Sequence, residues 1–390
     1  MIESVKIYAI KIINIIRYVI FLLLNFIISL QRQDKKSQTL LLIRLDSIGD
    51  YLLMRNFIPF IKSSLKYKSY KVTLCGNIIW KELAETFDAK WIDQFIWLDR
   101  KKFNSNVFYK YKLLRDIYKS GFEIVCDTTY SREILFGDLI VKSSKAETKI
   151  GCTGFPDTHV KWKRNLLTDK YYSRLINPLP GVNFEFYQNK DFFEKFLITF
   201  IDEKKPWLNV DSVLVKLPTR NEFIVVFPGG QEEQRRWSVE NYSLIIQMLL
   251  KEYNYDIIIA GSKSETLIAK KLIHFFNKQR VYDFTGQTSL PQLAKLIAKS
   301  SLLISNETSA VHFAASVGTI FICISNGQRF GRFMPYPKEM NVSGIYLYPD
   351  EIESKSDDYS YLAEKYRFGS DLDINSIKVE NVIKIIRQIL

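Results

Sequence analysis

Residues 302–325 read LLISNETSAVHFAASVGTIFICIS and decide the fold of the chain. The apolar run at the start stops at Asn306 and Glu307, three small residues follow, and a helix-like segment leads to a second apolar run. Strand, helix and strand in this order predict a unit of a parallel α/β sheet. An acid, two hydroxyls and a histidine lie in and just after the turn, where packing alone favours blander residues. This composition favours a ligand site, because open α/β sheets bind ligands at the carboxyl ends of their strands.

The same alternation extends through residues 221–349. The apolar runs FIVVF, YDIII and VYDF alternate with helical segments, of which SLPQLAKLIAKS has Ser289 as a predicted N-cap. The sequence therefore predicts a carboxy-terminal doubly wound α/β domain over residues 221–349. The acidic piece of residues 350–390 reads as a loop or variable insertion, followed by a closing helix.

The amino-terminal half shows a similar pattern from residue 38 to residue 205. The runs TLLLIR, YKVTLCG, WIDQFIWLD and FEIVCDTTYS are predicted strands of a second α/β domain. Residues 206–220 interrupt the pattern with Pro206 and Pro218, so we expect the interdomain linker there. Two such domains would place a cleft between the strand ends of both.

The charge and cysteine content of the chain indicate its binding partners and its cellular compartment. The chain has 390 residues, with 55 Lys and Arg against 42 Asp and Glu, which gives a formal charge of +13. This excess favours an anionic partner (nucleic acid, a membrane surface or a phosphorylated small molecule) unless it reflects a generally basic proteome. The four cysteines are far apart and form no CxxC pair, which indicates a reducing, cytosolic compartment. Three histidines and scattered cysteines predict no zinc site.

Residues 1–36 differ from the rest of the chain. At 100° per residue, polar side chains fall on one arc and the remaining face is almost entirely Ile, Leu, Val and Phe. We expect an amphipathic helix that lies in a membrane interface. Two alternatives stay open at this point: a helix that spans the bilayer, and a helix packed on a domain or in an oligomer.

Two loops at predicted strand ends contain charged residues. The first, RLDSIGD, has Ser47 and Gly49 in a tight turn and Asp50 at the start of a helix, where the carboxylate is either functional or complements the helix N-terminus. The second, FPGGQEEQRRW, follows Gly229 with Arg235 and Arg236. Arginine binds phosphate oxygens bidentately, although exposed arginine pairs are also common on solvated surfaces.

The turn of residues 305–312 suits a phosphate. Backbone N–H groups of Ser309, Ala310 and Val311 would stand at a helix N-terminus, where dipole and donors act together. Glu307 would then lie beside the phosphate and bind the hydroxyls of an attached sugar. His312 either donates to the phosphate or is a structural histidine.

Three segments resemble, in order and spacing, the family 9 glycosyltransferases, which include the ADP-heptose:lipopolysaccharide heptosyltransferases. They are LLIRLDSIGDYLL, FPGGQEEQRRWSVENY and FTGQTSLPQLAKLIAKSSLLISNETSAVHFAAS. The resemblance implies a GT-B fold, in which the first domain binds the acceptor and the second binds the nucleotide-sugar. It implies Asp50 as general base, Arg235, Arg236 and the turn Thr308, Ser309, Ala310 on the donor diphosphate, Glu307 on the donor sugar, and His312 as the histidine of that helix.

The resemblance has departures that touch the donor site. Arg235 stands where the family usually has Lys, Glu307 where Asp is more frequent, and Ser309 where Gly is common. The implied reaction is inverting transfer from a nucleotide-sugar, with ADP-heptose expected as donor and no metal required. The implied acceptor is an anionic glycolipid of the lipopolysaccharide core, so we expect a cytoplasmic protein at the face of the inner membrane and no nucleic acid.

Two other functions stay open on sequence grounds. One is a nucleotide-dependent epimerase or oxidoreductase, although RLDSIGD has a single glycine and no G-x-G-x-x-G follows the first strand. The other is a catalytically inactive binding protein that kept the fold. The sequence does not give the oligomeric state.

Overall fold

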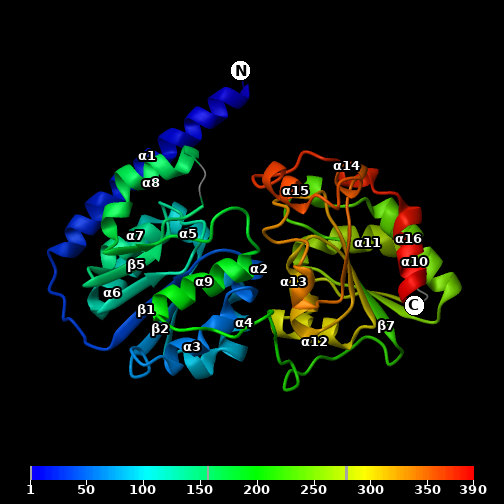
Figure 1. The fold of residues 1–390 in the computed structure, drawn as a ribbon, viewed down its shortest axis with the longest axis horizontal. Coiled ribbons are helices and arrows are strands. Elements are labelled where there is room, and N and C mark those ends of the chain that lie inside the picture. Colours follow the sequence, from blue (N-terminus) through cyan, green and yellow to red (C-terminus); the bar gives the residue numbers. More distant parts are fainter. Residues whose placement is uncertain (1, 156–157, 277–279) are drawn as a thin grey trace. The chain divides into compact units, whose positions relative to one another are not determined.

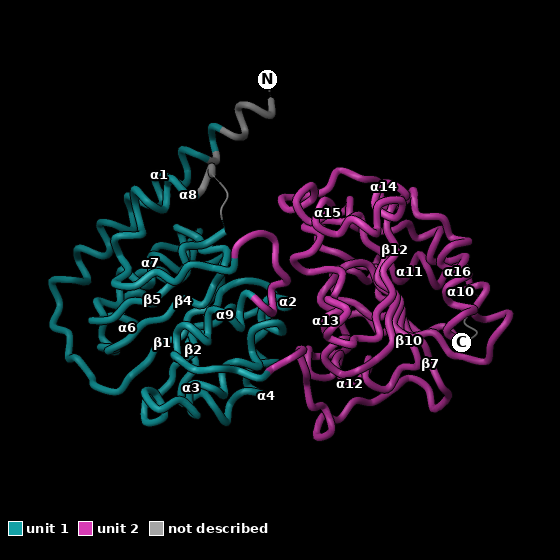
Figure 2. Tube along the Cα trace, viewed as in Figure 1, with its two compact units in different colours: residues 1–179, 188–202 teal, residues 180–187, 203–390 magenta. Residues whose placement is uncertain are grey.

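The computed structural model describes residues 2–155, 158–276 and 280–390, and the chain divides into two compact units. Unit 1 consists of Met1–Leu179 and Gln188–Asp202, and unit 2 consists of Pro180–Tyr187 and Glu203–Leu390 (Figure 2). The chain therefore passes from one unit to the other three times. The boundary at residue 203 precedes the expected linker, and the segment 206–220 lies within unit 2, where Leu208, Val210 and Val213 are buried.

Unit 1 is built around a six-stranded parallel sheet with the order β3-β2-β1-β4-β5-β6 (Figure 1). Its strands are β1 (Thr39–Arg44), β2 (Lys71–Asn77), β3 (Gln94–Leu98), β4 (Ile124–Asp127), β5 (Thr148–Cys152) and β6 (Arg174–Ile176). Its helices are α1 (Ile2–Ser29), α2 (Ile48–Leu52), α3 (Pro59–Ser63), α4 (Lys81–Phe87), α5 (Arg100–Ser105), α6 (Val107–Ser120), α7 (Gly137–Ser144), α8 (Thr158–Leu167) and most of α9 (Glu185–Leu197). Every residue of β1 is buried, as expected for a strand with neighbours on both sides and helices over both faces.

Unit 2 repeats this architecture with the order β12-β11-β10-β7-β8-β9. Its strands are β7 (Phe223–Phe227), β8 (Asp256–Ile259), β9 (Val281–Asp283), β10 (Leu302–Asn306), β11 (Phe321–Ile324) and β12 (Gly344–Leu347). Its helices are α10 (Val239–Glu252), α11 (Thr266–His274), α12 (Leu290–Lys299), α13 (Ser309–Val317), α14 (Asp350–Glu353), α15 (Tyr359–Lys365) and α16 (Val379–Ile389). The predicted N-cap is confirmed, because the Ser289 side chain accepts a hydrogen bond from the amide of Gln292.

The segment 350–390 is not the loop that the sequence suggested. It forms α14 and α15, whose Ile352, Leu362 and Ala363 pack into a small core with Phe330 and Tyr348. The closing helix α16 is present as expected and joins the main core of unit 2. The charged residues of this segment are therefore the outward face of helices with a buried apolar side.

Both sheets reverse their strand order at one point. In unit 1 the reversal lies between β1 and β4, and in unit 2 it lies between β7 and β10. At such a point the loops that follow the two central strands diverge to opposite faces of the sheet and leave a crevice between them. The loops with Asp50, Arg235 and Glu307 all follow these central strands, so the candidate residues lie where the topology favours a ligand.

Candidate functional site

Asn306, the last residue of β10, joins the two loops at the reversal point of unit 2. Its Nδ2 donates to the carbonyls of Pro228 at 2.7 Å and Gly229 at 2.9 Å. Its Oδ1 accepts from the amide of Trp237 at 3.1 Å and the hydroxyl of Tyr242 at 2.9 Å. The side chain is buried, so these bonds fix the glycine turn and the start of α10 in one geometry.

Arg235 and Glu307 form an ion pair across these loops. Arg235 Nη2 donates to the Glu307 carbonyl at 2.9 Å and to Glu307 Oε1 at 3.2 Å. The other carboxylate oxygen, Oε2, accepts from the Ser325 hydroxyl at 2.5 Å. Burial raises the pKa of Glu307, and the nearby Arg235, the Ser325 bond and the charge of Arg329 oppose that rise. The structure thus brings together two residues predicted for the donor site, while their roles stay predictions.

Arg236 and Gly229 shape the turn after β7. Arg236 Nε donates to the Gly230 carbonyl at 2.7 Å, so this guanidinium is tied to the turn while Arg235 is tied to Glu307. A Cβ at Gly229 would lie 1.4 Å from Glu265 Oε1, which explains why glycine stands there. Glu265 is itself fixed by Ser262, whose amide donates to its Oε2 at 2.6 Å.

The start of α13 differs from the expected row of three free amides. Thr308 is the N-cap, and its hydroxyl oxygen accepts from the Ala310 amide at 3.2 Å. The Val311 amide donates to the Thr308 carbonyl at 3.3 Å. These two amides therefore have partners within the first turn, and a phosphate would have to replace the Thr308 cap bond. Of the three amides, that of Ser309 is the one for which no hydrogen-bond partner is found among the described residues.

His312 lies inside unit 2. Its ring is buried, its Nδ1 is 2.8 Å from the Tyr336 hydroxyl, and its carbonyl accepts from Ser316. The ring also lies near Phe333. These contacts favour the structural alternative that the sequence left open for this histidine.

Sequence reasoning missed two side chains near the Glu307 carboxylate, Ser325, which donates to it, and Tyr348, on which its charge acts. Three adjacent strands, β10, β11 and β12, are followed directly by Glu307, Ser325 and Tyr348. The Glu307 amide donates a hydrogen bond to the Ile324 carbonyl and the Ser325 amide donates one to the Leu347 carbonyl, which keeps the strand ends in register. The charge of Glu307 contributes to the raised pKa of Tyr348, after burial and Cys323. Tyr348 Oη, Asn326 Nδ2 and Arg235 Nε are buried and lack a hydrogen-bond partner among the described residues. Unpaired buried donors around an acid suit a ligand rich in oxygen atoms.

In unit 1, a buried arginine organises the corresponding reversal point. Arg44 is fully buried at the end of β1 and donates to Asp46 Oδ1 at 2.9 Å and to the Thr128 carbonyl at 2.8 Å. It also donates to Asn189 Oδ1 at 2.9 Å and to the Asp50 carbonyl at 3.3 Å. This side chain thereby links β1, the loop after β4, helix α9 and the main chain of the proposed base. An arginine directly before a loop of small and acidic residues was the available sequence signal.

Asp50 is the third residue of the short helix α2. Its Oδ2 accepts from the Ser47 amide at 3.2 Å and from the Ser47 hydroxyl at 2.6 Å, which forms a capping box. Asp50 therefore caps the N-terminus of α2, as one of the two interpretations predicted. A catalytic role stays open, since no hydrogen bond to Oδ1 is found in the part of the chain that the structure describes. Gly49 lies in the first turn of α2, and its carbonyl accepts from Leu53.

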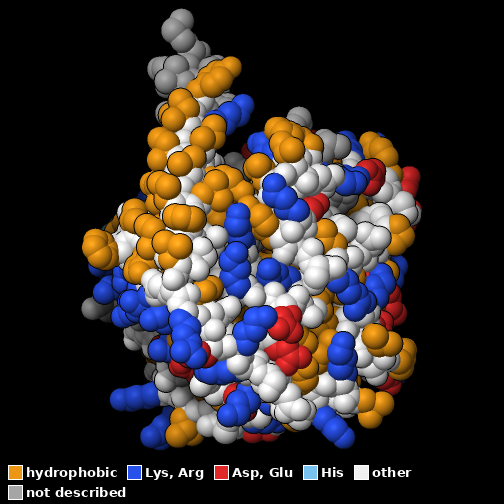
Figure 3. All heavy atoms as spheres, turned by 90° about the vertical axis from the view of Figure 1, so that its left-hand side faces the viewer, with side chains coloured by type: hydrophobic (Ala, Val, Ile, Leu, Met, Phe, Trp, Pro, Cys, Tyr) orange, Lys and Arg blue, Asp and Glu red, His pale blue; other side chains and the backbone are white. Residues whose placement is uncertain are grey.

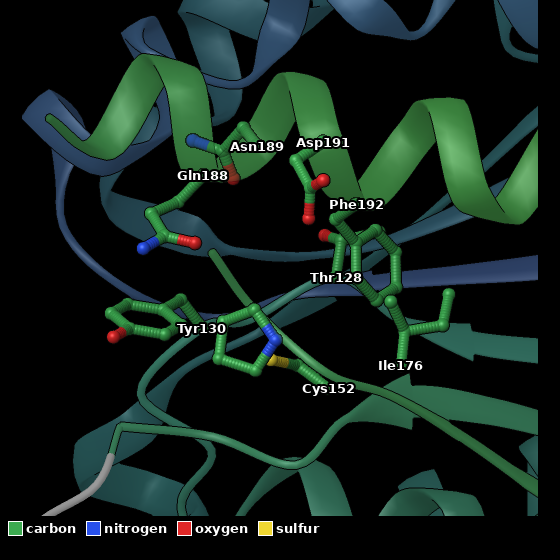
Figure 4. Close-up of a pocket in the computed structure, with 9 residues that line it drawn as sticks. Thr128, Tyr130, Cys152, Ile176, Gln188, Asn189, Asp191 and Phe192 are labelled. Atoms are coloured by element: carbon green, nitrogen blue, oxygen red, sulfur yellow. The ribbon is translucent and has the colours of Figure 1, made fainter. Parts of the chain in front are cut away.

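A small cavity lies beside this network in unit 1 (Figure 4). Thr128, Tyr130, Cys152 and Ile176 approach it from the ends of β4, β5 and β6, and α9 closes the other side. Its volume of about 10 Å³ is room for about one water molecule, so it is not a sugar site. Asn189 of α9 lines it and also accepts from Arg44.

Asp127, at the end of β4, gives a testable pH dependence. Burial, followed by the charge of Asp138, raises the pKa of Asp127 to about 6. The unfolded chain releases this proton near pH 3.8, so the folded state binds more protons between the two values and its stability falls as pH rises. The loss is complete above about pH 6 and amounts to about 3 kcal/mol. We expect Asp127→Asn to raise the melting temperature at neutral pH and to change it little near pH 4, as measured by calorimetry.

The outcome that contradicts this assignment is a constant difference in melting temperature across the pH range. Such a result would mean that the substitution acts through packing. Gly137 lies directly against Asp127, so a packing effect is the natural competitor, and it would not vary with pH.

Comparison with known proteins identifies relatives for part of the chain. The model of glycosyltransferase family 9 (heptosyltransferase) matches residues 199–360. The lipopolysaccharide core heptosyltransferase OpsX of Haemophilus influenzae is 27% identical over 128 residues, which are 32% of this chain and 35% of that relative. The match thus spans about a third of the relative. These findings confirm the resemblance that the motifs indicated, and two of the three motifs lie within the matched residues.

Solved structures of related proteins confirm the GT-B-like α/β fold. A family 9 glycosyltransferase of Veillonella parvula has a TM-score of 0.67 at 15% identity, covering 91% of this chain and 97% of that one. An E. coli heptosyltransferase solved with ADP has a TM-score of 0.66 at 14% identity, covering 90% and 100%. A putative UDP-N-acetylglucosamine 2-epimerase of Listeria monocytogenes reaches 0.53 at 9% identity, covering 90% and 96%. The fold alone therefore does not separate transferase from epimerase.

Proposed function

We propose that this protein is an inverting glycosyltransferase that moves a sugar, with heptose as the first candidate, from an ADP-sugar to an acceptor of the lipopolysaccharide core. The observation that carries the proposal is the polar cluster around Glu307 at the reversal point of unit 2. It combines Arg235 and Arg236 with a helix start and several buried donors, and it lies within the residues that match the family. The E. coli heptosyltransferase solved with ADP supports ADP as the nucleotide of the donor.

The donor's two ends have different requirements that this cluster meets. The diphosphate needs positive charge, for which Arg235, Arg236 and the start of α13 at Thr308, Ser309 and Ala310 are the candidates. The sugar hydroxyls need acceptors and donors together, for which we assign Glu307 with Asn326 and Tyr348. Guanidinium groups and a helix terminus neutralise the leaving diphosphate without a metal ion, so we propose a metal-independent reaction.

In the reaction, Asp50 takes the proton of the acceptor hydroxyl. The freed oxygen attacks the anomeric carbon, and the bond from that carbon to the diphosphate oxygen breaks with its electron pair, which releases ADP. The attack comes from the face opposite the leaving group and inverts the anomeric configuration. The capping bonds from Ser47 hold one carboxylate oxygen of Asp50, so the proton goes to the other.

We propose that the acceptor is an anionic glycolipid at the cytoplasmic face of the inner membrane. The net charge of +13 favours a negatively charged surface, and the curated relative acts in lipopolysaccharide core synthesis according to its name. A basic enzyme that works on a lipid-anchored substrate gains by residing at that surface.

Ligand binding and turnover test the proposal. We expect calorimetric titration to show binding of ADP and none of NAD, and incubation with ADP-heptose and lipopolysaccharide-core acceptor to release ADP. Binding of UDP with interconversion of UDP-sugars would favour the epimerase alternative. ADP binding without release of product from any nucleotide-sugar would favour the inactive binding protein.

A further inference from the structure

Helix α1 packs on unit 1 through the face that contains its polar residues. Phe21, Asn25 and Ile28 are buried against the core formed with α6 and α7. The Tyr18 hydroxyl lies 2.5 Å from that of Tyr171, in the short helix η4 (Asp169–Tyr171) that follows α8. Arg17, on the same side, is half-buried. The protein therefore covers Asn25 and part of Arg17, leaves Lys11 of the polar stripe exposed, and turns the opposite face of α1 outward.

The outward face of α1 is apolar from Ile12 to Ile27. Figure 3 shows a ridge of hydrophobic side chains that follows the helix. Its exposed members are Ile12, Ile13, Ile15, Ile16, Val19, Leu22, Leu23, Phe26, Ile27 and Leu30. A helix on the surface of a water-soluble protein shows the reverse arrangement, with apolar residues on the core. A continuous apolar surface of this length marks a site that is covered in the working protein.

Basic side chains flank this ridge. Lys142 of α7 lies over the Phe21 ring at 6.0 Å, and the charges of Lys145 and Lys170 act on it. Within the described residues, no carboxylate lies within 4 Å of these three lysines. Figure 3 shows Lys and Arg side chains gathered beside α1. α8, which precedes Tyr171, adds the exposed side chains of Trp162 and Leu166, and tryptophan is enriched at membrane interfaces.

We propose that the outward face of α1 docks in the plane of an anionic bilayer, with its apolar ridge in the acyl boundary and the flanking lysines on the lipid headgroups. This inference deepens the membrane localisation proposed above and is independent of the proposed chemistry. A second copy of the chain is a poorer occupant, because a twofold contact through this ridge would bring two unpaired lysine flanks together.

An in-plane helix also fits better than a spanning one. Residues Lys11–Ser29 are long and apolar enough to cross a membrane. Yet within that stretch Asn25 is buried, and Tyr18 bonds to Tyr171, whose hydroxyl accepts from Lys142 at 3.3 Å. If α1 crossed the bilayer and kept these contacts, the polar side chains of unit 1 beside it would lie in hydrocarbon, which is energetically costly.

Vesicle co-sedimentation of the full chain tests the proposal. We expect binding to vesicles of phosphatidylcholine with phosphatidylglycerol, weaker binding to phosphatidylcholine alone, and release by alkaline carbonate. The double variant Leu23→Ser, Phe26→Ser, at positions 60% and 62% exposed, should bind the mixed vesicles about thirtyfold more weakly. The matched control is Leu65→Ser, which removes a side chain 92% exposed beyond α3 and should bind like the wild type.

Four results would overturn the docking proposal. They are equal binding of the double variant and the wild type, equal loss in the Leu65 control, resistance of the wild type to carbonate extraction, and a dimer in lipid-free buffer that the double variant dissociates. Turnover of a soluble, delipidated acceptor separates this proposal from the proposed chemistry. The double variant should keep that turnover, and absence of turnover in the wild type would count against the chemistry alone.

Discussion

Replacing Asp50 with alanine should lower the turnover of glycosyl transfer about a thousandfold or more and leave ADP affinity nearly unchanged. Removal of a positioned general base costs about two to four orders of magnitude, because the acceptor hydroxyl is a weak nucleophile without it. Asp50 lies in unit 1, whereas the candidate diphosphate residues Arg235 and Arg236 lie in unit 2, so the nucleotide should not sense the change. Steady-state kinetics with saturating donor and calorimetric titration of ADP measure the two quantities.

Ser47→Ala is the matched control for this experiment. It removes the 2.6 Å bond from the hydroxyl to Asp50 Oδ2 and keeps the carboxylate. If Asp50 only caps α2, both variants should have similar small effects, because a lost N-cap costs about 1 kcal/mol of stability. If Asp50 is the base, Ser47→Ala should retain most of the activity. Turnover retained in Asp50→Ala, or equal loss of turnover and ADP affinity, contradicts the assignment.

The sequence predicted the central strands of both sheets and the edge strands β3 and β9, and it missed β5, β6 and β12. β1 and β7 are continuous buried runs, so their composition alone identifies them. β5 begins with the partly exposed Thr148 and Lys149, and β6 has only three residues. β12 is an edge strand whose residues are all half-buried. None of these three strands has the continuous buried apolar run of β1 or β7, so composition alone does not reveal them.

The division of the chain depends on contacts that no local pattern encodes. Pro206 and Pro218 suggested a linker, but Leu208 donates its amide to the Ser316 carbonyl and its side chain is buried. Residues 180–187 join unit 2 before the chain returns to unit 1, because Arg332 pairs with Glu185 at 2.9 Å. Ion pairs between residues so far apart in the chain are visible only in three dimensions.

The sequence identified those residues of the candidate site that lie in a loop directly after a predicted strand. Glu307 and Arg235 were identified because each stands in a loop after an apolar run. Asn306 was visible only as the end of such a run, and its four hydrogen bonds depend on loops more than sixty residues away. Tyr348 approaches Glu307 through the register of β10, β11 and β12, and no sequence pattern predicted β12. Similarly, the sequence predicted the two faces of α1 but not which of them packs on the protein.

Arg235→Ala should lower kcat/KM for the nucleotide-sugar about a thousandfold. Two losses add in this variant: a charge on the donor diphosphate, and the partner of the buried Glu307. The unpaired carboxylate would then repel the diphosphate. The change should appear in donor affinity as well as in turnover, whereas acceptor affinity should stay within about twofold of the wild type. Calorimetric titration of ADP and steady-state kinetics with varied donor measure these effects.

Arg235→Lys and Arg236→Ala complete the test. The resemblance to family 9 implies lysine at this position. Its ammonium keeps the charge but loses the fork that bonds both the carbonyl and Oε1 of Glu307. Arg235→Lys should therefore retain activity within about tenfold. Arg236→Ala removes a guanidinium whose Nε donates to Gly230, so its effect should be smaller than that of Arg235→Ala. Equal effects of the two alanine variants, or unchanged ADP affinity in Arg235→Ala, would show that Arg235 supports the loop and does not bind the diphosphate.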